Sequence, residues 1–351
     1  MTTELKKLRL GVAGVGHWGP NLIRNFYTNN KSSVTAVCDT DTKRLSLIQS
    51  AYPEVKVTTS FNDLINNNEV DALVIATPTE THYELAKKAL SANKHVLIEK
   101  PVATKPEECE ELIRLAQAKN LHLFVGHIFI YNAGINAVKE YLDSGDMGRI
   151  YYVNMARTNL GPIRRDVNAF WDLAPHDISI LNYWFPEKPV TVSAVGAVYL
   201  NNEVEDTVYA TFRYADGKIA NIHTSWLNPK KVREIVIVGE KKMLVWDDMD
   251  LNHPIKIYDK NVTFIKTDEQ LIDTYSGFHA NIHEGDTLMP KILLNEPLKA
   301  ECEAFLNVVQ NGEKSLSSGL EGAHVVNALV AADQSMLADG KEIEINYTTG
   351  E

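Results

Sequence analysis

The sequence predicts an α/β protein with two sheets: a doubly wound parallel sheet in the first part and a large open, mostly antiparallel sheet in the second. Up to about residue 125, short β-branched runs alternate with helical patterns, which is typical of a parallel sheet covered by helices. After residue 125, strand-like runs follow one another with turn residues between them. We therefore expect one domain over residues 1–125 and a second over residues 126–351.

The length and composition support this division and exclude several classes of protein. The chain has 351 residues, enough for two domains, and its 44% hydrophobic and 23% charged residues are ordinary for a globular protein. Lys and Arg number 35 against 46 Asp and Glu, so the net charge of -11 argues against nucleic-acid binding.

The cysteines and apolar runs indicate where the protein works. Cys38, Cys109 and Cys302 are scattered and few, so neither a disulfide framework nor a zinc site is expected, and we expect no bound metal. No apolar run approaches the roughly 18 residues of a membrane span, and the N-terminus lacks a signal-peptide pattern. We expect a soluble, cytoplasmic protein with no membrane partner.

Six strands are predicted in the first half, with helices between them. They cover residues 8–15, 34–38, 55–58, 72–75, 96–98 and 121–125. The helix before the sixth strand has Thr104 as its expected N-cap and Pro106 in its first turn.

The second half is predicted to hold a helix over residues 133–142, several strands and two late helices. The strands cover residues 150–156, 190–199, 207–214, 219–226 and 235–238, and the late helices cover 298–310 and 320–337. The turn at residues 215–217 indicates a hairpin. Residues 258–286 show the weakest pattern and are interpreted as a long loop.

A glycine motif follows the first strand. Gly14, Gly16 and Gly19 fit Gly-x-Gly-x-x-Gly between a predicted strand and a predicted helix, where backbone N–H groups can reach a pyrophosphate. Asp39 stands twenty residues after Gly19, at the end of the second strand, where a carboxylate can accept hydrogen bonds from ribose hydroxyls. Together these features predict a Rossmann domain that binds a dinucleotide.

The charge of Asp39 favours NAD over NADP, because it would repel a 2′-phosphate. Lys43 and Arg44 lie close in sequence and could soften that repulsion, although a solvated helix face is the favoured interpretation of both residues.

Two further segments follow the fourth and fifth strands, at the sheet edge where ligands bind in open α/β sheets. The first contains Thr77, Pro78 and His82, and the second is Glu99-Lys100-Pro101. Pro101 biases Lys100 away from helical dihedral angles and holds it at the rim of the expected cleft.

The second half supplies Asp172 and His176, just before a helical apolar pattern. Because Pro175 is tolerated near a helix start, we expect His176 in the first turn, where the helix dipole keeps the ring neutral and able to accept a proton. The alternative is that Asp172 caps the helix and His176 only packs.

These motifs together resemble the glucose-fructose oxidoreductase and inositol dehydrogenase family, called Gfo/Idh/MocA. The resemblance implies a Rossmann domain followed by a domain whose open sheet forms a subunit interface, hence a homo-oligomer such as a dimer or tetramer. It also implies that Lys100, Asp172 and His176 are catalytic. Residues 126–133 lack the arginine of the family's Arg-Phe-x-Pro run, and Ala174-Pro175 replaces a glycine between the catalytic Asp and His.

Residues 157–168 and 171–177 look like the branch of the family found among nucleotide-sugar dehydrogenases, such as UDP-N-acetylglucosamine 3-dehydrogenase. The expected activity is therefore NAD-dependent oxidation of a secondary hydroxyl of a nucleotide sugar. The alternatives are a dehydrogenase of a free sugar, polyol or inositol, and a non-catalytic NAD-binding regulator.

The expected site residues form two sets. The cofactor set is Gly14, Gly16, His17, Trp18, Gly19, Asp39, Arg44, Thr77, Pro78, His82, Glu99 and Lys100. The substrate set is Arg157, Asn159, Arg164, Arg165, Asp172 and His176. The arginines suit a diphosphate, since guanidinium groups bind phosphate in bidentate fashion, but they could instead pair with Asp166, Asp172 or Asp177 and only hold the loop.

Overall fold

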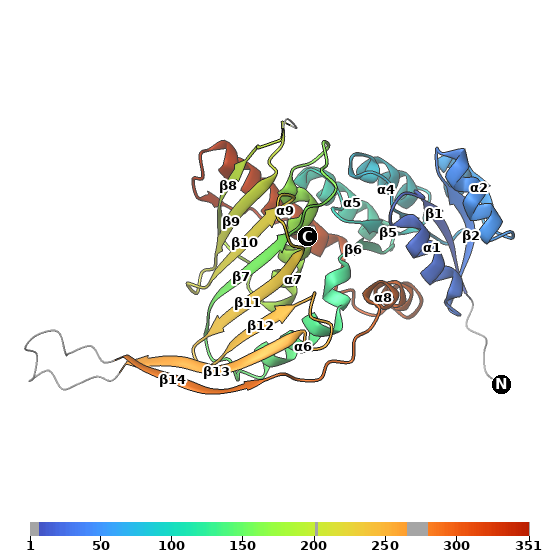
Figure 1. Ribbon diagram of the computed structural model, residues 1–351. Coiled ribbons are helices and arrows are strands. Elements are labelled where there is room, and N and C mark those ends of the chain that lie inside the picture. The colour runs from blue at the N-terminus through green and yellow to red at the C-terminus, as the bar shows by residue number, and fades with distance from the viewer. Residues whose placement is uncertain (1–6, 201–202, 265–279, 351) are drawn as a thin grey trace, which may run out of the picture. The chain divides into compact units, whose positions relative to one another are not determined.

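The computed structural model describes residues 7–200, 203–264 and 280–350, and it divides into two compact units (Figure 1). The first unit comprises Met1–Tyr131, Asn295–Val330 and Asn346–Glu351, and the second comprises Asn132–Leu294 and Ala331–Ile345. The sequence placed everything after residue 125 in one domain, whereas residues 295–330 and 346–350 pack with the first unit.

The first unit contains a six-stranded sheet in the order β3-β2-β1-β4-β5-β6, and every neighbouring pair is parallel. Its strands are β1 (Leu8–Ala13), β2 (Ser32–Cys38), β3 (Lys56–Thr58), β4 (Ala72–Ile75), β5 (His95–Glu99) and β6 (Leu123–Gly126). The predicted doubly wound sheet is confirmed. Its strand order reverses between β1 and β4, and ligands bind beside this switch point in such folds.

Helices connect these strands. They are α1 (Gly19–Thr28), α2 (Thr42–Ala51), α3 (Phe61–Ile65), α4 (His82–Ser91) and α5 (Pro106–Ala118), with short 3-10 turns η1 (Thr79–Thr81) and η2 (Ile128–Tyr131). The N-cap of α5 is Lys105 and makes no side-chain cap, so the expectation of Thr104 is wrong by one residue. Pro106 starts the helix, because its missing N–H has no partner to lose there.

Late segments complete the first unit. Helix α8 (Pro297–Asn311) packs against α1 and η2, and α9 (Gly319–Leu337) follows it and belongs to the first unit only as far as Val330. The backbone N–H of Val125 donates to the Ser317 carbonyl at 2.8 Å, and the Ser317 hydroxyl donates to the Val125 carbonyl at 2.5 Å. These bonds cover the outer edge of β6, which would otherwise expose unpaired backbone groups.

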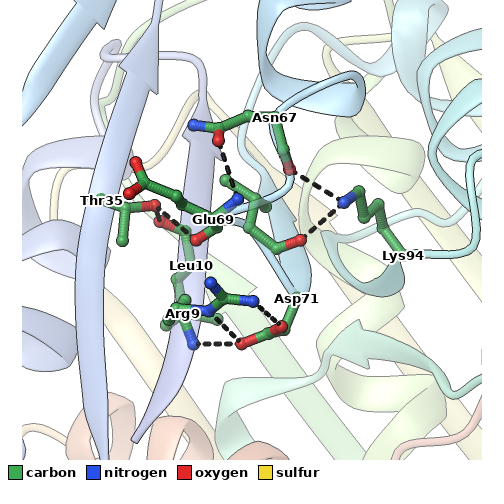
Figure 2. A network of polar contacts seen from close by, with 8 residues as sticks. Arg9, Leu10, Thr35, Asn67, Glu69, Asp71 and Lys94 are labelled. Carbon is green, nitrogen blue, oxygen red and sulfur yellow. Dashed lines mark hydrogen bonds and ion pairs between the residues drawn. The ribbon is translucent and has the colours of Figure 1, made fainter.

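A polar network joins β1 to the turn that precedes β4 (Figure 2). The Arg9 guanidinium donates to both carboxylate oxygens of Asp71, from Nε at 2.9 Å and from Nη2 at 2.7 Å. Nζ of Lys94 donates to the carbonyls of Val70 at 2.6 Å and Asn67 at 3.0 Å. The network lies at the amino ends of β1, β4 and β5, away from the carboxyl ends where the glycine loop lies.

The second unit contains a nine-stranded sheet in the order β14-β13-β12-β11-β7-β10-β9-β8-β15. Only β7 and β10 are paired in parallel, so the expectation of a mostly antiparallel sheet is confirmed. The strands are β7 (Ile150–Thr158), β8 (Thr191–Ala197), β9 (Thr207–Arg213), β10 (Ile219–Ser225), β11 (Val232–Gly239), β12 (Met243–Asp247), β13 (Ile255–Phe264), β14 (Ala280–Leu288) and β15 (Ile343–Glu344).

Helices cover one face of this sheet. Helix α7 (Ala169–Trp184) packs against β7, β9 and β10, and α6 (Ala133–Asp143) packs against β12. Residues facing the helices, such as Met155, Phe212 and Ile222, are buried, whereas alternate residues on the same strands are partly or fully exposed. This alternation with period two is the sequence signature that predicted the strands.

The structure confirms one predicted connection and corrects another. Gly217 adopts a positive φ of 89° in the predicted hairpin turn between β9 and β10. Residues 258–264 and 280–286 are not a loop, because they belong to β13 and β14, which pair antiparallel at the sheet edge (Figure 1). The remainder of the expected loop lies outside the described residues. None of the helices in the described ranges is long and apolar enough to cross a membrane.

Candidate active site

The glycine loop connects β1 to α1, and backbone crowds two of its three motif glycines too closely for a side chain. Gly14 has φ of +94°, and a Cβ there would lie 2.5 Å from the carbonyl oxygen of Ala76. A Cβ on Gly19 would lie 2.1 Å from the Gly14 carbonyl oxygen. Helix α1 starts at Gly19, and its N-cap Trp18 makes no side-chain capping bond. The first turn therefore offers its N–H groups to an anion instead of to a capping side chain.

Asp39 lies beside this loop. Its Oδ2 accepts the backbone N–H of Val15 at 2.6 Å, and its Oδ1 accepts the N–H of Asp41 at 2.8 Å. The structure therefore places the carboxylate between the glycine loop and the end of β2. Arg44 also reaches the loop, since its Nη1 would lie 3.8 Å from a Cβ on Gly16.

The exposed residues of the loop are His17 and Trp18, whose rings meet edge to face at 5.8 Å.

The segment after β4 is tied to the segment after β5 by His82. This histidine is buried, and its Nδ1 lies 2.7 Å from the Pro101 carbonyl while its Nε2 lies 2.9 Å from the Thr77 carbonyl. The hydroxyls of Thr77 and Thr81 lie 2.7 Å apart. His82, expected as a cofactor residue, therefore joins the segment after β4 to the segment after β5. Thr77 is half-buried and Pro78 is exposed.

Glu99 and Lys100 end β5 and are half-buried. Burial raises the pKa of Glu99 above its ordinary value, against the opposing attraction of Lys100. Oε2 of Glu99 lies where a Cβ on Gly126 would meet it at 3.2 Å, so the glycine at the end of β6 makes room for this carboxylate. The pKa of Glu301, a fully buried residue of α8, is raised by burial and by the charge of Glu99. Glu301 was not singled out from the sequence.

The second unit carries Asp172 and His176 on α7. The helix begins at Ala169, capped by Asn168, whose Oδ1 accepts the N–H of Trp171 at 3.0 Å. His176 is therefore the eighth residue of the helix, and the expectation of a first-turn position is wrong. Pro175 misled it, because this proline stands inside the helix rather than at its start. The helix dipole at the start of α7 therefore gives no reason to expect a neutral His176.

Asp172 is held on both of its oxygens. The indole N–H of Trp226 donates to Oδ2 at 3.1 Å, and Nη1 of Arg164 donates to Oδ1 at 3.1 Å. Trp226, the residue following β10, is fully buried, and its backbone N–H donates to the Asp206 carbonyl at 3.0 Å. Nothing in the sequence marked Trp226, because its contact with Asp172 is made across 54 residues of chain.

Asp333 accepts hydrogen bonds from two residues at the start of α7. The indole N–H of Trp171 donates to Oδ2 of Asp333 at 2.6 Å, and Nδ2 of Asn168 donates to Oδ1 of Asp333 at 3.3 Å. Burial raises the pKa of Asp333, although both of these hydrogen bonds oppose the rise.

The arginines expected to bind substrate occupy different environments. Arg157 is buried and donates from Nε and Nη2 to Asp177, with the shortest distance 2.7 Å. Arg157 thus pairs with an acidic residue on α7, as expected under the alternative in which the arginines have a structural role. Arg164 pairs with Asp166 and Asp172, and Arg165 is exposed.

Asn159 is half-buried, and its backbone N–H donates to the Ser225 carbonyl at 3.1 Å.

Two family models match the chain. Residues 8–127 match the oxidoreductase family with an NAD-binding Rossmann fold, and residues 135–245 match the GFO/IDH/MocA C-terminal domain. The chain belongs to the Gfo/Idh/MocA family. It is accordingly an oxidoreductase that uses NAD and acts on CH–OH groups.

The names of similar family members state different substrates. The chain is 28% identical over 92% of its length, and 95% of the relative's, to UDP-N-acetylglucosamine 3-dehydrogenase of Acidithiobacillus ferrooxidans. A solved structure of an enzyme of that name and source has a TM-score of 0.77 at 25% identity, covering 95% of this chain and 99% of the other. The chain is also 24% identical to myo-inositol 2-dehydrogenase of Thermotoga maritima, over 98% of this chain and all of that one.

The first unit fits NAD. Gly14 and Gly19 let the loop pack against neighbouring backbone, and the uncapped start of α1 offers N–H groups to a pyrophosphate. Asp39 provides a carboxylate at the end of β2 for ribose hydroxyls. Among the described ranges, no group of three His, Cys, Asp or Glu side chains could hold a metal ion.

Proposed function

We propose that this oxidoreductase oxidises a secondary hydroxyl of a nucleotide-linked sugar, for example a UDP-N-acetylhexosamine to its 3-keto form. The observation that carries the proposal is the similarity to UDP-N-acetylglucosamine 3-dehydrogenase over 92% of the chain. The cationic loop before α7 supports it, because Arg164 and Arg165 offer guanidinium groups to a diphosphate on a chain whose net charge is -11.

NAD, held by the glycine loop and Asp39, would supply the hydride acceptor for the carbinol carbon. His176 takes the hydroxyl proton, a role for which imidazole is suited near neutral pH. Lys100 donates a hydrogen bond to the same oxygen and stabilises the negative charge that develops on it. The two roles can be exchanged, because a lysine with a lowered pKa also accepts a proton.

Asp172 orients the base and stabilises its charged form. The fixed position of its carboxylate supports this role, since Trp226 and Arg164 each hold one oxygen. A carboxylate held in this way needs little reorganisation when positive charge appears on the base.

The substrate's diphosphate would bind Arg164 and Arg165, with Asn159 close by in sequence. Arg157 is left out of this set, because its guanidinium is committed to Asp177 in a buried pair. Binding energy from the nucleotide would position the neutral sugar hydroxyl against the nicotinamide.

The test compares kcat/KM for a UDP-sugar with that for the matching free sugar, followed by NADH absorbance. A clear preference for the UDP-sugar is expected, because the diphosphate supplies remote binding energy. Equal values would defeat the diphosphate anchor. They would favour a free sugar, polyol or inositol substrate, the alternative that the similarity to myo-inositol 2-dehydrogenase supports.

A further inference from the structure

The second unit contains two arginine–aspartate pairs that differ sharply in burial. The side chains of Arg157 and Asp177 are 5% and 2% exposed, whereas those of Arg164 and Asp172 are 32% and 19% exposed. Removing one partner of a buried pair leaves an uncompensated buried charge and is strongly destabilising. A partly exposed pair contributes little to stability. Arg164 is therefore the arginine that can change partners.

Arg164 holds two carboxylates at once. Its Nε and Nη2 donate to Asp166 at 3.0 and 2.5 Å, and its Nη1 donates to Oδ1 of Asp172 at 3.1 Å. The pair with Asp166 is local, two residues along the chain, whereas the contact with Asp172 joins the loop to α7. The same guanidinium thus touches the proposed anchor region and the proposed catalytic carboxylate.

We propose that Arg164 is a substrate-sensing latch on Asp172. Without an anionic substrate, Nη1 of Arg164 occupies Oδ1 of Asp172. The diphosphate of a nucleotide sugar draws the guanidinium away, and Oδ1 becomes able to accept a hydrogen bond from the protonated base. This inference rests on the proposed nucleotide-sugar substrate, and it makes Arg164 a specificity-determining residue.

The hydrogen bond from Trp226 would keep the Asp172 carboxylate in place when Arg164 moves from Asp172 to the diphosphate. In the structure the indole N–H lies 3.1 Å from Oδ2, and the backbone N–H of Trp226 is bonded to the Asp206 carbonyl. Phosphate oxygens compete well for arginine, because they accept two parallel hydrogen bonds and carry more charge than one carboxylate. A neutral sugar has no group that could compete, so it would leave Asp172 latched.

Binding of uridine diphosphate tests the latch without any turnover. By calorimetry, Arg164→Ala should weaken UDP binding by about tenfold or more, the loss of one charge-assisted contact. Asp172→Asn should strengthen it by about threefold to fivefold, because a competing pair worth up to about 1 kcal/mol is gone. In the Arg164→Ala background, Asp172→Asn should change nothing, as a double-mutant cycle requires for direct coupling.

The cycle separates the latch from simple repulsion. If Asp172→Asn strengthened UDP binding equally in both backgrounds, the carboxylate would merely repel the anion and the latch would be overturned. No effect of Asp172→Asn in the wild-type background would overturn it as well. Arg213→Ala is the matched control, because Arg213 also forms a partly exposed pair, with Glu342 at 3.6 Å. It should bind UDP as the wild type does.

A kinetic experiment tests the release of Asp172. With a free sugar as substrate, added UDP should raise kcat of the wild type and of Arg213→Ala by at least about threefold. The reason is that the separate UDP molecule draws Arg164 away from Asp172. Arg164→Ala should show no such activation. Activation of Arg164→Ala to the same degree would overturn the latch.

Different results would contradict the proposed function and the latch. If the wild type neither bound UDP nor preferred UDP-sugars, the nucleotide-sugar substrate would be wrong and the latch would fall with it. If the wild type preferred UDP-sugars but the binding cycle showed no coupling, only the latch would be wrong.

Discussion

Oδ2 of Asp39 accepts the backbone N–H of Val15 at 2.6 Å, which joins the end of β2 to the glycine loop. The other oxygen of the same carboxylate accepts the N–H of Asp41. Asp39 therefore shapes the loop that receives the pyrophosphate as well as standing where the adenosine ribose is expected. A change at this residue should alter both the choice of cofactor and the order of the loop.

Replacing Asp39 with Ser should weaken NAD binding by the loss of charge-assisted hydrogen bonds worth roughly 1.5–3 kcal/mol. NADP should improve relative to NAD, because the charge that repels its 2′-phosphate is removed. Titration of NADH and NADPH by fluorescence measures both constants. Glu69→Gln, which removes a carboxylate paired with Lys56 at the amino end of β3, is the control and should leave the preference unchanged. A wild type that preferred NADP would contradict this role for Asp39.

Lys100→Met and His176→Ala should each lower turnover by at least about a hundredfold, the usual effect of losing a general acid or base. NAD binding should stay near normal, because the glycine loop and Asp39 are untouched. Steady-state kinetics and NADH titration on the same preparations provide the measurement. Turnover close to that of the wild type in both variants would remove these residues from the reaction.

The sequence predicted the cofactor half of the site better than the substrate half. The glycine motif and Asp39 are local in sequence, and the structure brings them together through the bond from Val15 to Asp39. Trp226 could not be foreseen, because its bond to Asp172 depends on how β10 packs against α7. Arg157, predicted to bind substrate, is paired with Asp177, and only burial distinguishes it from Arg164.

The fold shows the same division between local and long-range information. Periodicity located the strands of the first sheet to within about two residues, since each burial pattern is local. The packing of α8 on α1 was missed, because it joins segments more than 260 residues apart. The pairing of β13 with β14 was also missed, because β14 is exposed along its length and lacks an alternating apolar pattern.

Acid should destabilise the first unit through His95. Its Nδ1 accepts the His122 backbone N–H at 3.1 Å, and the two rings stack at 5.3 Å. Burial, followed by the charge of His122, lowers the pKa of His95 to about 4. The unfolded chain, with a histidine pKa near 6.5, then binds more protons than the folded chain between pH 6.5 and 4. Stability is therefore complete above pH 6.5 and is lost as the pH falls toward 4.

Urea unfolding between pH 7.5 and 4.5 measures this loss. The slope that His95 contributes is at most about 1.4 kcal/mol per pH unit. His95→Gln should flatten the profile, whereas the exposed His253, changed in the same way, should not. Identical profiles for the wild type and His95→Gln would contradict the assignment.

The face of the nine-stranded sheet that α6 and α7 leave uncovered should form an interface between copies of this chain. Tyr209, 55% exposed, stacks on His223 of the next strand, with ring centroids 4.1 Å apart. Two residues further along β7 from the residue beside His223, Asn154 lies opposite Val236 of β11, near the middle of the sheet. An open face that carries aromatic and aliphatic side chains is typical of a surface that a second subunit covers.

Light scattering at micromolar concentration should therefore show a dimer or tetramer. Val236→Glu should dissociate it, because a symmetric interface brings the new charge on one copy close to the same charge on the other and buries both. Leu337→Glu, at the end of α9 and 89% exposed, adds the same charge outside this face and should leave the assembly intact. Far-ultraviolet circular dichroism would establish that both variants fold. A monodisperse wild-type monomer would contradict the interface, and dissociation by both substitutions alike would show that charge, not position, was responsible.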